Sequence, residues 1–128
     1  MIYSNQIHKN SGLQAILENN GETIWLYIND SYGNTLRDCW VLNASPNILA
    51  DQKREFTSPA PIQFTQNTPD TSRIKKTDFD VSWRQDGEAV HVSLFGNKVC
   101  CLRLEEGRGY NIYLNQICPW GLPYSELV

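Results

Sequence analysis

The strictest alternation of apolar and polar positions lies in the second half of the chain. Residues 79–84, Phe-Asp-Val-Ser-Trp-Arg, alternate without interruption, which is the period of a strand with one buried face. Asp86-Gly87 follows, a pair that favours a two-residue hairpin turn into the next apolar stretch. The pairs that this turn predicts for the inner face are Trp83 with Val90, Val81 with Val92, and Phe79 with Leu94.

The connection at residues 95–98 is compatible with two registers. A two-residue Gly96-Asn97 loop would place Arg103 opposite Val90 on the buried face, where a charged side chain is costly. A three-residue loop, with Asn97 in the left-handed conformation and an adjacent bulge, places Leu102 opposite Val90 instead. We therefore predict the three-residue loop.

A loop around residues 105–109 then leads into a fourth strand. The inner-face pairs predicted for the last two hairpins are Val92 with Cys100, Leu104 with Tyr110, Leu102 with Ile112, and Cys100 with Leu114. These pairs predict that residues 78–115 form an antiparallel meander of about four strands, apolar on one side and polar on the other.

The polar side of this meander carries a row of side chains that resembles catalytic machinery. The predicted row consists of Ser82, His91, Cys101 and Tyr113, with Asp80 diagonal to the histidine. A cysteine beside a histidine, with a carboxylate behind, is the arrangement that activates a thiolate nucleophile. A flat, solvated sheet face, however, neither excludes water nor aims backbone amides at an oxyanion. We therefore interpret the row as cross-strand polar packing and predict no catalytic residue.

Residues 13–42 predict a second hairpin and a further strand. Asn20-Gly21 favours another two-residue turn. The inner-face pairs that it predicts are Leu17 with Ile24, Ala15 with Leu26, and Leu13 with Ile28. The reverse face is also apolar, because it carries Ile16, Trp25 and Tyr27, and residues 38–42 are apolar on both sides. This half is therefore either central to the sheet or covered by another part of the chain.

The remaining segments show no strand period. Residues 43–77 predict an irregular connection, in which Ser45-Pro46 could begin one or two helical turns toward Gln52 and residues 59–61 are extended. The tail, residues 116–128, is too rich in proline for a strand or helix and is expected to fold back over the core. The chain is thus predicted to be a single all-β domain over 1–128, mainly antiparallel. Its meander would curl into a sandwich or a partly open barrel, with at most one short helix.

Composition narrows the possible roles. The 128 residues carry 11 basic and 14 acidic side chains, a net charge of -3, which argues against nucleic acid as the main partner. No stretch approaches the roughly 20 apolar residues of a membrane helix. The first residues lack an export pattern, which predicts a cytoplasmic location. The four cysteines have no Cys-x-x-Cys spacing, so we expect buried free thiols, no metal site and no cofactor.

Aromatic residues are numerous, with four Trp, six Tyr and four Phe. Some of them lie on the second apolar face of the first half or in the tail, where they could anchor a partner or be covered by other segments of the chain. The candidates for partner binding are Trp25, Tyr27, Trp40, Trp120 and Tyr124.

Several short sequence motifs, spread over most of the chain, together resemble those of a known group of proteins. They are residues 20–23 (Asn-Gly-Glu-Thr), 38–40 (Asp-Cys-Trp), Trp83 with Asp86-Gly87, Gly109-Tyr110, and 119–123 (Pro-Trp-Gly-Leu-Pro). In these features the sequence resembles small uncharacterised bacterial proteins that end in Pro-Trp-Gly-x-Pro, some of which look like immunity partners of secreted toxins. The resemblance implies a class of protein and carries no functional residue over to this chain.

The leading hypothesis is a non-enzymatic protein that binds another protein, such as an immunity protein that caps a toxin. An acidic surface would speed the capture of a basic partner such as a nuclease toxin, and self-association through a sheet edge is also open. A small ligand-binding β-barrel is the first alternative. A cysteine-dependent enzyme that uses Cys101 and His91 is the second.

Overall fold

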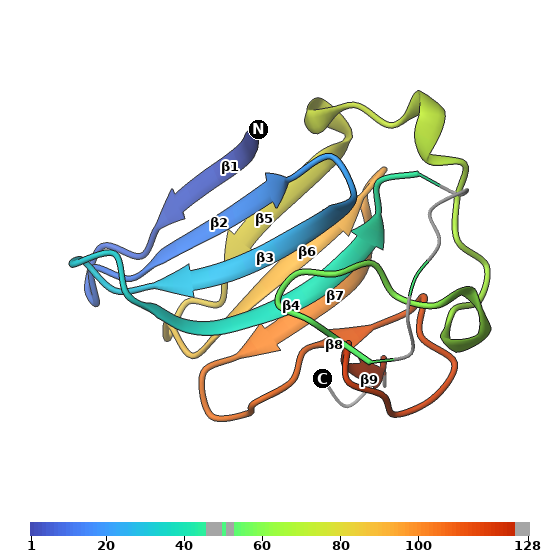
Figure 1. The fold of residues 1–128 in the computed structure, drawn as a ribbon. Helices are drawn as coiled ribbons and strands as arrows, with labels where there is room; N and C mark the ends of the chain where they lie inside the picture. Colours follow the sequence, from blue (N-terminus) through green and yellow to red (C-terminus); the bar gives the residue numbers. More distant parts are fainter. Residues whose placement is uncertain (46–49, 51–52, 125–128) are drawn as a thin grey trace.

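The strands form two sheets that follow the order of the chain (Figure 1). The computed structural model describes all residues except 46–49, 51–52 and 125–128. The first sheet contains β1 (Ile2–Ile7), β2 (Gln14–Asn19), β3 (Thr23–Asn29) and β4 (Thr35–Asn43). The second contains β5 (Phe79–Trp83), β6 (Ala89–Leu94), β7 (Asn97–Arg103), β8 (Tyr110–Asn111) and β9 (Leu122–Pro123). The sheets pack as a sandwich without closing into a barrel, which confirms the predicted all-β, mainly antiparallel class.

In its described residues, the connection between the sheets is irregular, as predicted, and contains three single 3₁₀ turns. They are η1 (Ile62–Phe64), η2 (Thr71–Arg73) and η3 (Lys76–Asp78). The helical turns expected between Ser45 and Gln52 fall largely outside the described residues. In the part of the chain that the structure describes, no helix is both long enough and apolar enough to cross a bilayer.

The first two hairpins of the meander have the predicted registers, with one correction at the second turn. Trp83 pairs with Val90, and Val90 pairs with Leu102. Leu94 pairs with Asn97, and the left-handed residues of the turn are Phe95 (φ 51°) and Gly96 (φ 80°), so the predicted three-residue loop with a left-handed Asn97 is wrong. The two-residue turn keeps the predicted register because the extra residue is accommodated inside the strand, at a bulge opposite residues 92–93.

The register predicted for the N-terminal hairpin is wrong by two residues, because Leu17 pairs with Leu26 instead of Ile24. The cause is the side chain of Asn20, whose Oδ1 accepts the backbone N–H groups of Glu22 (2.9 Å) and Thr23 (2.8 Å). These bonds move the turn one residue along, to positions 21–22. Since the shift is even, the same side chains still face inward.

The register predicted for the last hairpin of the meander is wrong by three residues. Cys101 lies opposite Tyr110 and Cys100 opposite Asn111, so Tyr113 does not extend the polar row. The odd shift turns Asn111 into the core, where it is 1% exposed. Its amide donates to the backbone carbonyls of Trp40 (3.0 Å) and Val41 (2.9 Å) in β4, which explains why this register is preferred.

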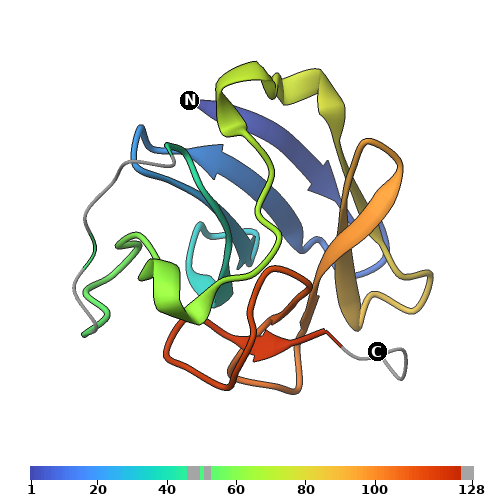
Figure 2. The same ribbon diagram turned by 90° about the vertical axis from the view of Figure 1, so that its right-hand side faces the viewer.

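The tail folds back over the core, as predicted, but it also forms a short strand. β9 pairs in parallel with β8, so the prediction that the tail forms no strand is wrong. Pro123 is tolerated because β9 is an edge strand, where a missing N–H breaks no ladder. Figure 2 shows the tail, in red, below both sheets in that view, and Trp120 in it is buried.

The core lies between the inner faces of the two sheets and continues on the outer face of the first sheet, where Trp25 and Trp40 are buried. The largest fully buried side chains are Trp25, Trp40, Trp120, Leu17, Leu26, Ile28, Leu42, Leu102, Leu114, Val41, Val90 and Val92. On the side opposite the β4–β8 contact, the indole N–H of Trp83 donates to the carbonyl of Gln6 in β1 (2.8 Å). The ring of His8 lies 5.5 Å from the ring of Trp83. The two sheets are therefore connected along both sides.

Candidate protein-interaction site

The β3–β4 side of the outer face of the first sheet is covered by the chain's own residues 53–60. Arg54 lies over the ring of Trp25, with its guanidinium carbon 4.8 Å from the ring centre. The side chain of Asn43 bonds to the backbone of Ala60 in both directions, at 2.8 and 2.9 Å, and accepts the indole N–H of Trp40. This segment thus covers the part of the predicted second apolar face that carries Trp25 and Trp40, whereas Ile16 and Tyr27 remain partly exposed.

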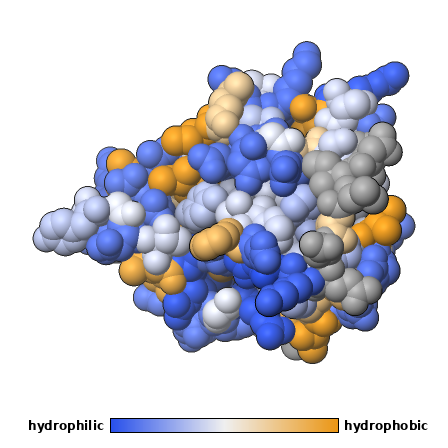
Figure 3. Space-filling view, in the orientation of Figure 1, coloured by the Kyte–Doolittle hydropathy of each residue, from blue (hydrophilic) through white to orange (hydrophobic). Residues whose placement is uncertain are grey.

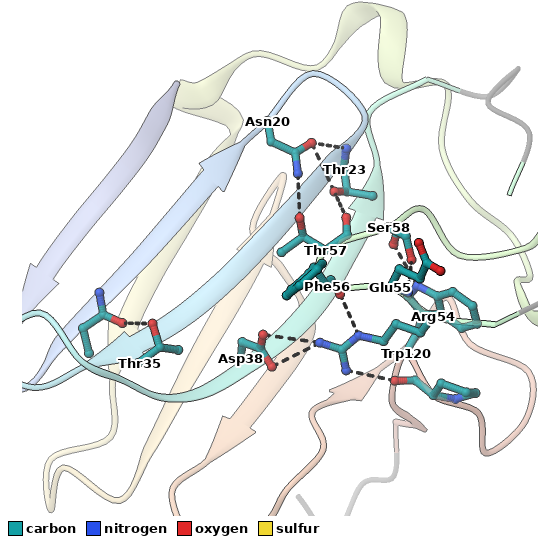
Figure 4. A network of polar contacts seen from close by, with 12 residues as sticks. Asn20, Thr23, Thr35, Asp38, Arg54, Glu55, Phe56, Thr57, Ser58 and Trp120 are labelled. Atoms are coloured by element: carbon teal, nitrogen blue, oxygen red, sulfur yellow. Dashed lines mark hydrogen bonds and ion pairs between the residues drawn. The ribbon is translucent and has the colours of Figure 1, made fainter. Parts of the chain in front are cut away.

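Arg54 connects three parts of the molecule (Figure 4). Its Nη2 lies 3.3 Å from the carboxylate of Asp38 in β4, its Nε donates to the carbonyl of Phe56, and its Nη1 donates to the carbonyl of Pro119 in the tail. The pair with Asp38 is partly exposed, so its own contribution to stability is small. Its main effect is to hold residues 54–56 against the sheet.

The turn that follows, residues 55–58, is fixed on both sides. The N–H of Ser58 donates to the carbonyl of Glu55 (3.0 Å), and the carbonyl of Ser58 accepts the indole N–H of Trp120 (2.8 Å). Thr57 is held by the N-terminal hairpin, because its carbonyl accepts from the Thr23 hydroxyl (2.6 Å). Its own hydroxyl accepts from the Asn20 amide. The turn therefore has a defined position on the surface (Figure 4).

Phe56 occupies the first central position of this turn and is 92% exposed. Its φ is 49°, in the left-handed region that costs an L-residue about 1–2 kcal/mol and that glycine adopts freely. A phenylalanine at this position has an unfavourable backbone conformation, and its ring buries almost no apolar surface in return. The burial of the ring thus gives no reason for a phenylalanine here, which makes Phe56 a candidate for a binding role.

The surface beside Phe56 is a shallow groove of about 410 Å³, which we call the Phe56 groove. The residues that line it are Asn20, Glu22, Glu55, Phe56, Thr57 and Ser58. Two carboxylates lie among these described residues, and no basic side chain does. Tyr27 lies behind the turn, and its pKa is raised. The main cause is burial, followed by the carboxylates of Glu18 and Asp38, and these outweigh a hydrogen bond with Thr57 that lowers the pKa. The lining of the Phe56 groove is therefore acidic, and the neighbouring Arg54 is paired with Asp38.

The five candidates predicted from the sequence lie in different environments. Trp25, Trp40 and Trp120 are buried. They contact Arg54, Asn43 and Ser58 respectively, so in this conformation they belong to the interior. Tyr27 and Tyr124 are partly exposed and remain candidates. Sequence reasoning missed Phe56 because it stands alone in a polar, aperiodic stretch, where only its isolation could have drawn attention.

The row on the polar side of the meander forms in part. His91 lies opposite Ser82 and Cys101, as predicted. Burial, followed by the proximity of Cys100, raises the pKa of Cys101 to about 11. Burial, followed by the charges of Lys98 and Arg84, lowers the pKa of His91. Both shifts oppose a thiolate–imidazolium pair, which needs a lowered thiol pKa and a raised histidine pKa.

A second cavity lies between β4 and the connection, beside Trp40 and Asn43, and has about 80 Å³ of space, well below the roughly 300 Å³ typical of small-molecule sites. Among the described side chains, no three of the metal-ligating types come together. Figure 3 shows a mostly hydrophilic face, with apolar residues in separate small patches.

Comparison with known proteins adds no assignment. The chain matches no protein-family model, and no curated protein or solved structure is significantly similar to it. The resemblance to immunity-like bacterial proteins therefore stays a prediction from the sequence, and any function must be argued from the groove itself.

Proposed function

We propose that this protein binds a partner protein through the Phe56 groove. The observation that carries the proposal is the exposed ring of Phe56 at a left-handed backbone position in a turn that is otherwise held by hydrogen bonds. A rigidly presented aromatic side chain binds with little loss of conformational freedom. Aromatic residues are also over-represented among the side chains that dominate binding energy at interfaces.

The partner that best fits the groove presents arginine or lysine side chains. Glu22 and Glu55 flank Phe56, so a cation could pair with a carboxylate and also lie over the ring. The net charge of -3 would accelerate the encounter with a basic protein. An immunity protein that caps a basic toxin is one partner relation with this chemistry. Self-association through the groove would bring like charges together.

Phe95 provides a matched comparison on the same molecule. It also has a left-handed backbone (φ 51°) and an exposed ring. It differs because it lies in the β6–β7 hairpin turn, followed by Gly96, and it does not line the Phe56 groove. A variant at Phe95 therefore controls for the general loss of an exposed phenylalanine from a left-handed position.

The variant Phe56→Gly separates a binding role from a folding role. Glycine tolerates the left-handed backbone and the ring is not buried, so we expect the free energy of unfolding to stay unchanged or rise by up to about 1 kcal/mol. Urea unfolding measures this change. Binding to the partner recovered from the source cells should weaken at least tenfold, about 1.4 kcal/mol, as for other central interface aromatics.

The control Phe95→Gly should bind the same partner with unchanged affinity. The proposal would be contradicted by equal binding of Phe56→Gly and the unaltered protein. A loss of stability by several kcal/mol in Phe56→Gly would also contradict it, because the ring would then have a folding role.

A further inference from the structure

The two sheets bring together two cysteines that are far apart in the sequence. Cys39 lies in β4 and Cys100 in β7, 61 residues later, and their Sγ atoms are 3.3 Å apart. Both side chains are buried, and neither forms a disulfide. They come from opposite layers of the sandwich, so a bond between them would join the two sheets directly.

The local backbone explains this close approach. Stacked sheets are usually about 10 Å apart, but here the Asn111 side chain, which lies opposite Cys100, reaches the backbone carbonyls of Trp40 and Val41. Gly109 also lies against Cys39, since a Cβ added at Gly109 would be 2.5 Å from the Cys39 Cβ. The absence of a side chain at Gly109 thus lets β4 approach the second sheet beside the two thiols.

The other two cysteines do not share this geometry. Cys101 follows Cys100 in β7 and therefore faces the opposite side of the sheet, where it lies opposite His91 and Tyr110. Cys118 lies in the tail, where its backbone bonds to Gly121. The pair Cys39–Cys100 is thus the one that the fold holds in position for a bond.

We propose that Cys39 and Cys100 are an oxidisable pair, which low-molecular-weight disulfides convert into an inter-sheet disulfide. Sulfur atoms in a disulfide are about 2.05 Å apart, so the Sγ atoms need to approach by roughly 1.3 Å. In the first step the Cys39 thiolate attacks RS–SR, which forms a mixed disulfide and releases RS⁻. Cys100 loses its proton and attacks the Cys39 Sγ, which closes the protein disulfide and releases the second RS⁻. Two protein thiols are oxidised, and one RS–SR is reduced to two RSH.

The environment makes this reaction slow in the closed fold. The hydrogen bond with Cys100, together with burial, raises the pKa of the Cys39 thiol well above its ordinary value. The thiolate is therefore scarce at neutral pH, and the buried Sγ is inaccessible to a disulfide reagent. We expect oxidation to proceed through local opening of the sandwich, and hence to accelerate with rising pH and with low, non-denaturing concentrations of urea.

The test treats the purified full chain with 2-hydroxyethyl disulfide at mildly alkaline pH and then counts thiols after denaturation. The count should fall from four to two, and peptide mapping should identify a Cys39–Cys100 bond. The cross-link closes a long loop, so the melting temperature should rise by about 10 °C and return to its original value after reduction with dithiothreitol. Cys101→Ala and Cys118→Ala should form the same Cys39–Cys100 bond, whereas Cys100→Ala should go no further than a mixed disulfide on Cys39, with no protein cross-link and no rise in melting temperature.

Three results would overturn the proposal. The first is a count of four thiols after prolonged oxidation in low urea. The second is a bond that joins any other pair of cysteines in the mapped peptides. The third is a lower melting temperature of the cross-linked protein, which would show that the folded geometry does not accommodate the bond. Mapping uses the unaltered chain, so it remains decisive even if a cysteine variant fails to fold.

Discussion

Replacing Asn111 with leucine is expected to lower the free energy of unfolding by about 4 kcal/mol. The buried amide donates to the carbonyls of Trp40 and Val41, and its Oδ1 accepts the N–H of Tyr113 (2.8 Å). In Asn111→Leu these three backbone groups lose their hydrogen bonds to the Asn111 side chain, at a position that is buried between the sheets. Each orphaned group costs about 1–3 kcal/mol, a large fraction of the 5–15 kcal/mol of a typical domain. Urea unfolding measures the loss.

Asn115 supplies a matched control on the same segment. Its amide also donates to two backbone carbonyls, those of Gln63 (2.9 Å) and Thr65 (3.2 Å), but it is exposed. Water can replace these bonds, so Asn115→Leu should cost less than about 1 kcal/mol. Equal losses for the two variants would show that burial of Asn111 between the sheets has no special energetic weight, and would contradict this account of how the sheets are joined.

Gly109→Ala is the second substitution with a large expected effect. The added Cβ would lie 2.5 Å from the Cβ and 2.7 Å from the Sγ of Cys39, so β4 and the second sheet would have to separate. Overpacking of this kind costs about 1–3 kcal/mol, and the neighbouring Asn111 bonds to β4 would be strained as well. We expect a loss of about 3 kcal/mol, measured by the midpoint of urea unfolding.

Gly107 is the control for this substitution. It lies two residues earlier in the same loop, and a Cβ built on it meets no atom within 4 Å. Gly107→Ala should therefore change stability by no more than about 0.5 kcal/mol in either direction. If Gly109→Ala were equally mild, the close approach of β4 at Cys39 would be wrong, and with it the geometric basis of the proposed disulfide.

The alternating stretch at residues 79–84 predicted its strand and its partners because a single buried face determines which side chains turn inward. With the turn placed at Asp86-Gly87, only one register of the two strands pairs apolar residues with apolar residues on the inner face. The same reasoning placed Cys100 inward and Cys101 outward. These features depend on local pattern and turn chemistry, which a sequence displays directly.

Two of the register errors arose where a polar side chain determined the geometry. Asn20 moved its hairpin by two residues through bonds to the backbone, and Asn111 turned inward to reach the carbonyls of β4. An argument from hydrophobic pattern assigns asparagine to the surface, so it could not find either effect. Trp25 and Trp40 were placed correctly on the outer face, but the segment that covers them has no period that predicts its path.

The candidate site was hidden for the same reason. Phe56 lies in an aperiodic stretch, and its importance depends on a left-handed backbone and on a turn held by the distant residues Thr23 and Trp120. Long-range hydrogen bonds of this kind have no sequence signature. The net charge of -3 shows an excess of acidic side chains, but where carboxylates gather on the molecule could be seen only from the fold.

Site-specific photo-cross-linking at the groove tests the central claim most directly. Phe56 would be replaced by p-benzoylphenylalanine, which keeps an aromatic ring at this position, and Phe95 would be replaced in the same way in a control chain. Irradiation in the source cells should link the chain labelled at position 56 to one basic protein. The link should be lost in the double-charge variant Glu22→Gln/Glu55→Gln and absent from the chain labelled at position 95. A partner that cross-links equally from position 95, or that is retained after both carboxylates are removed, would contradict the assignment of the Phe56 groove.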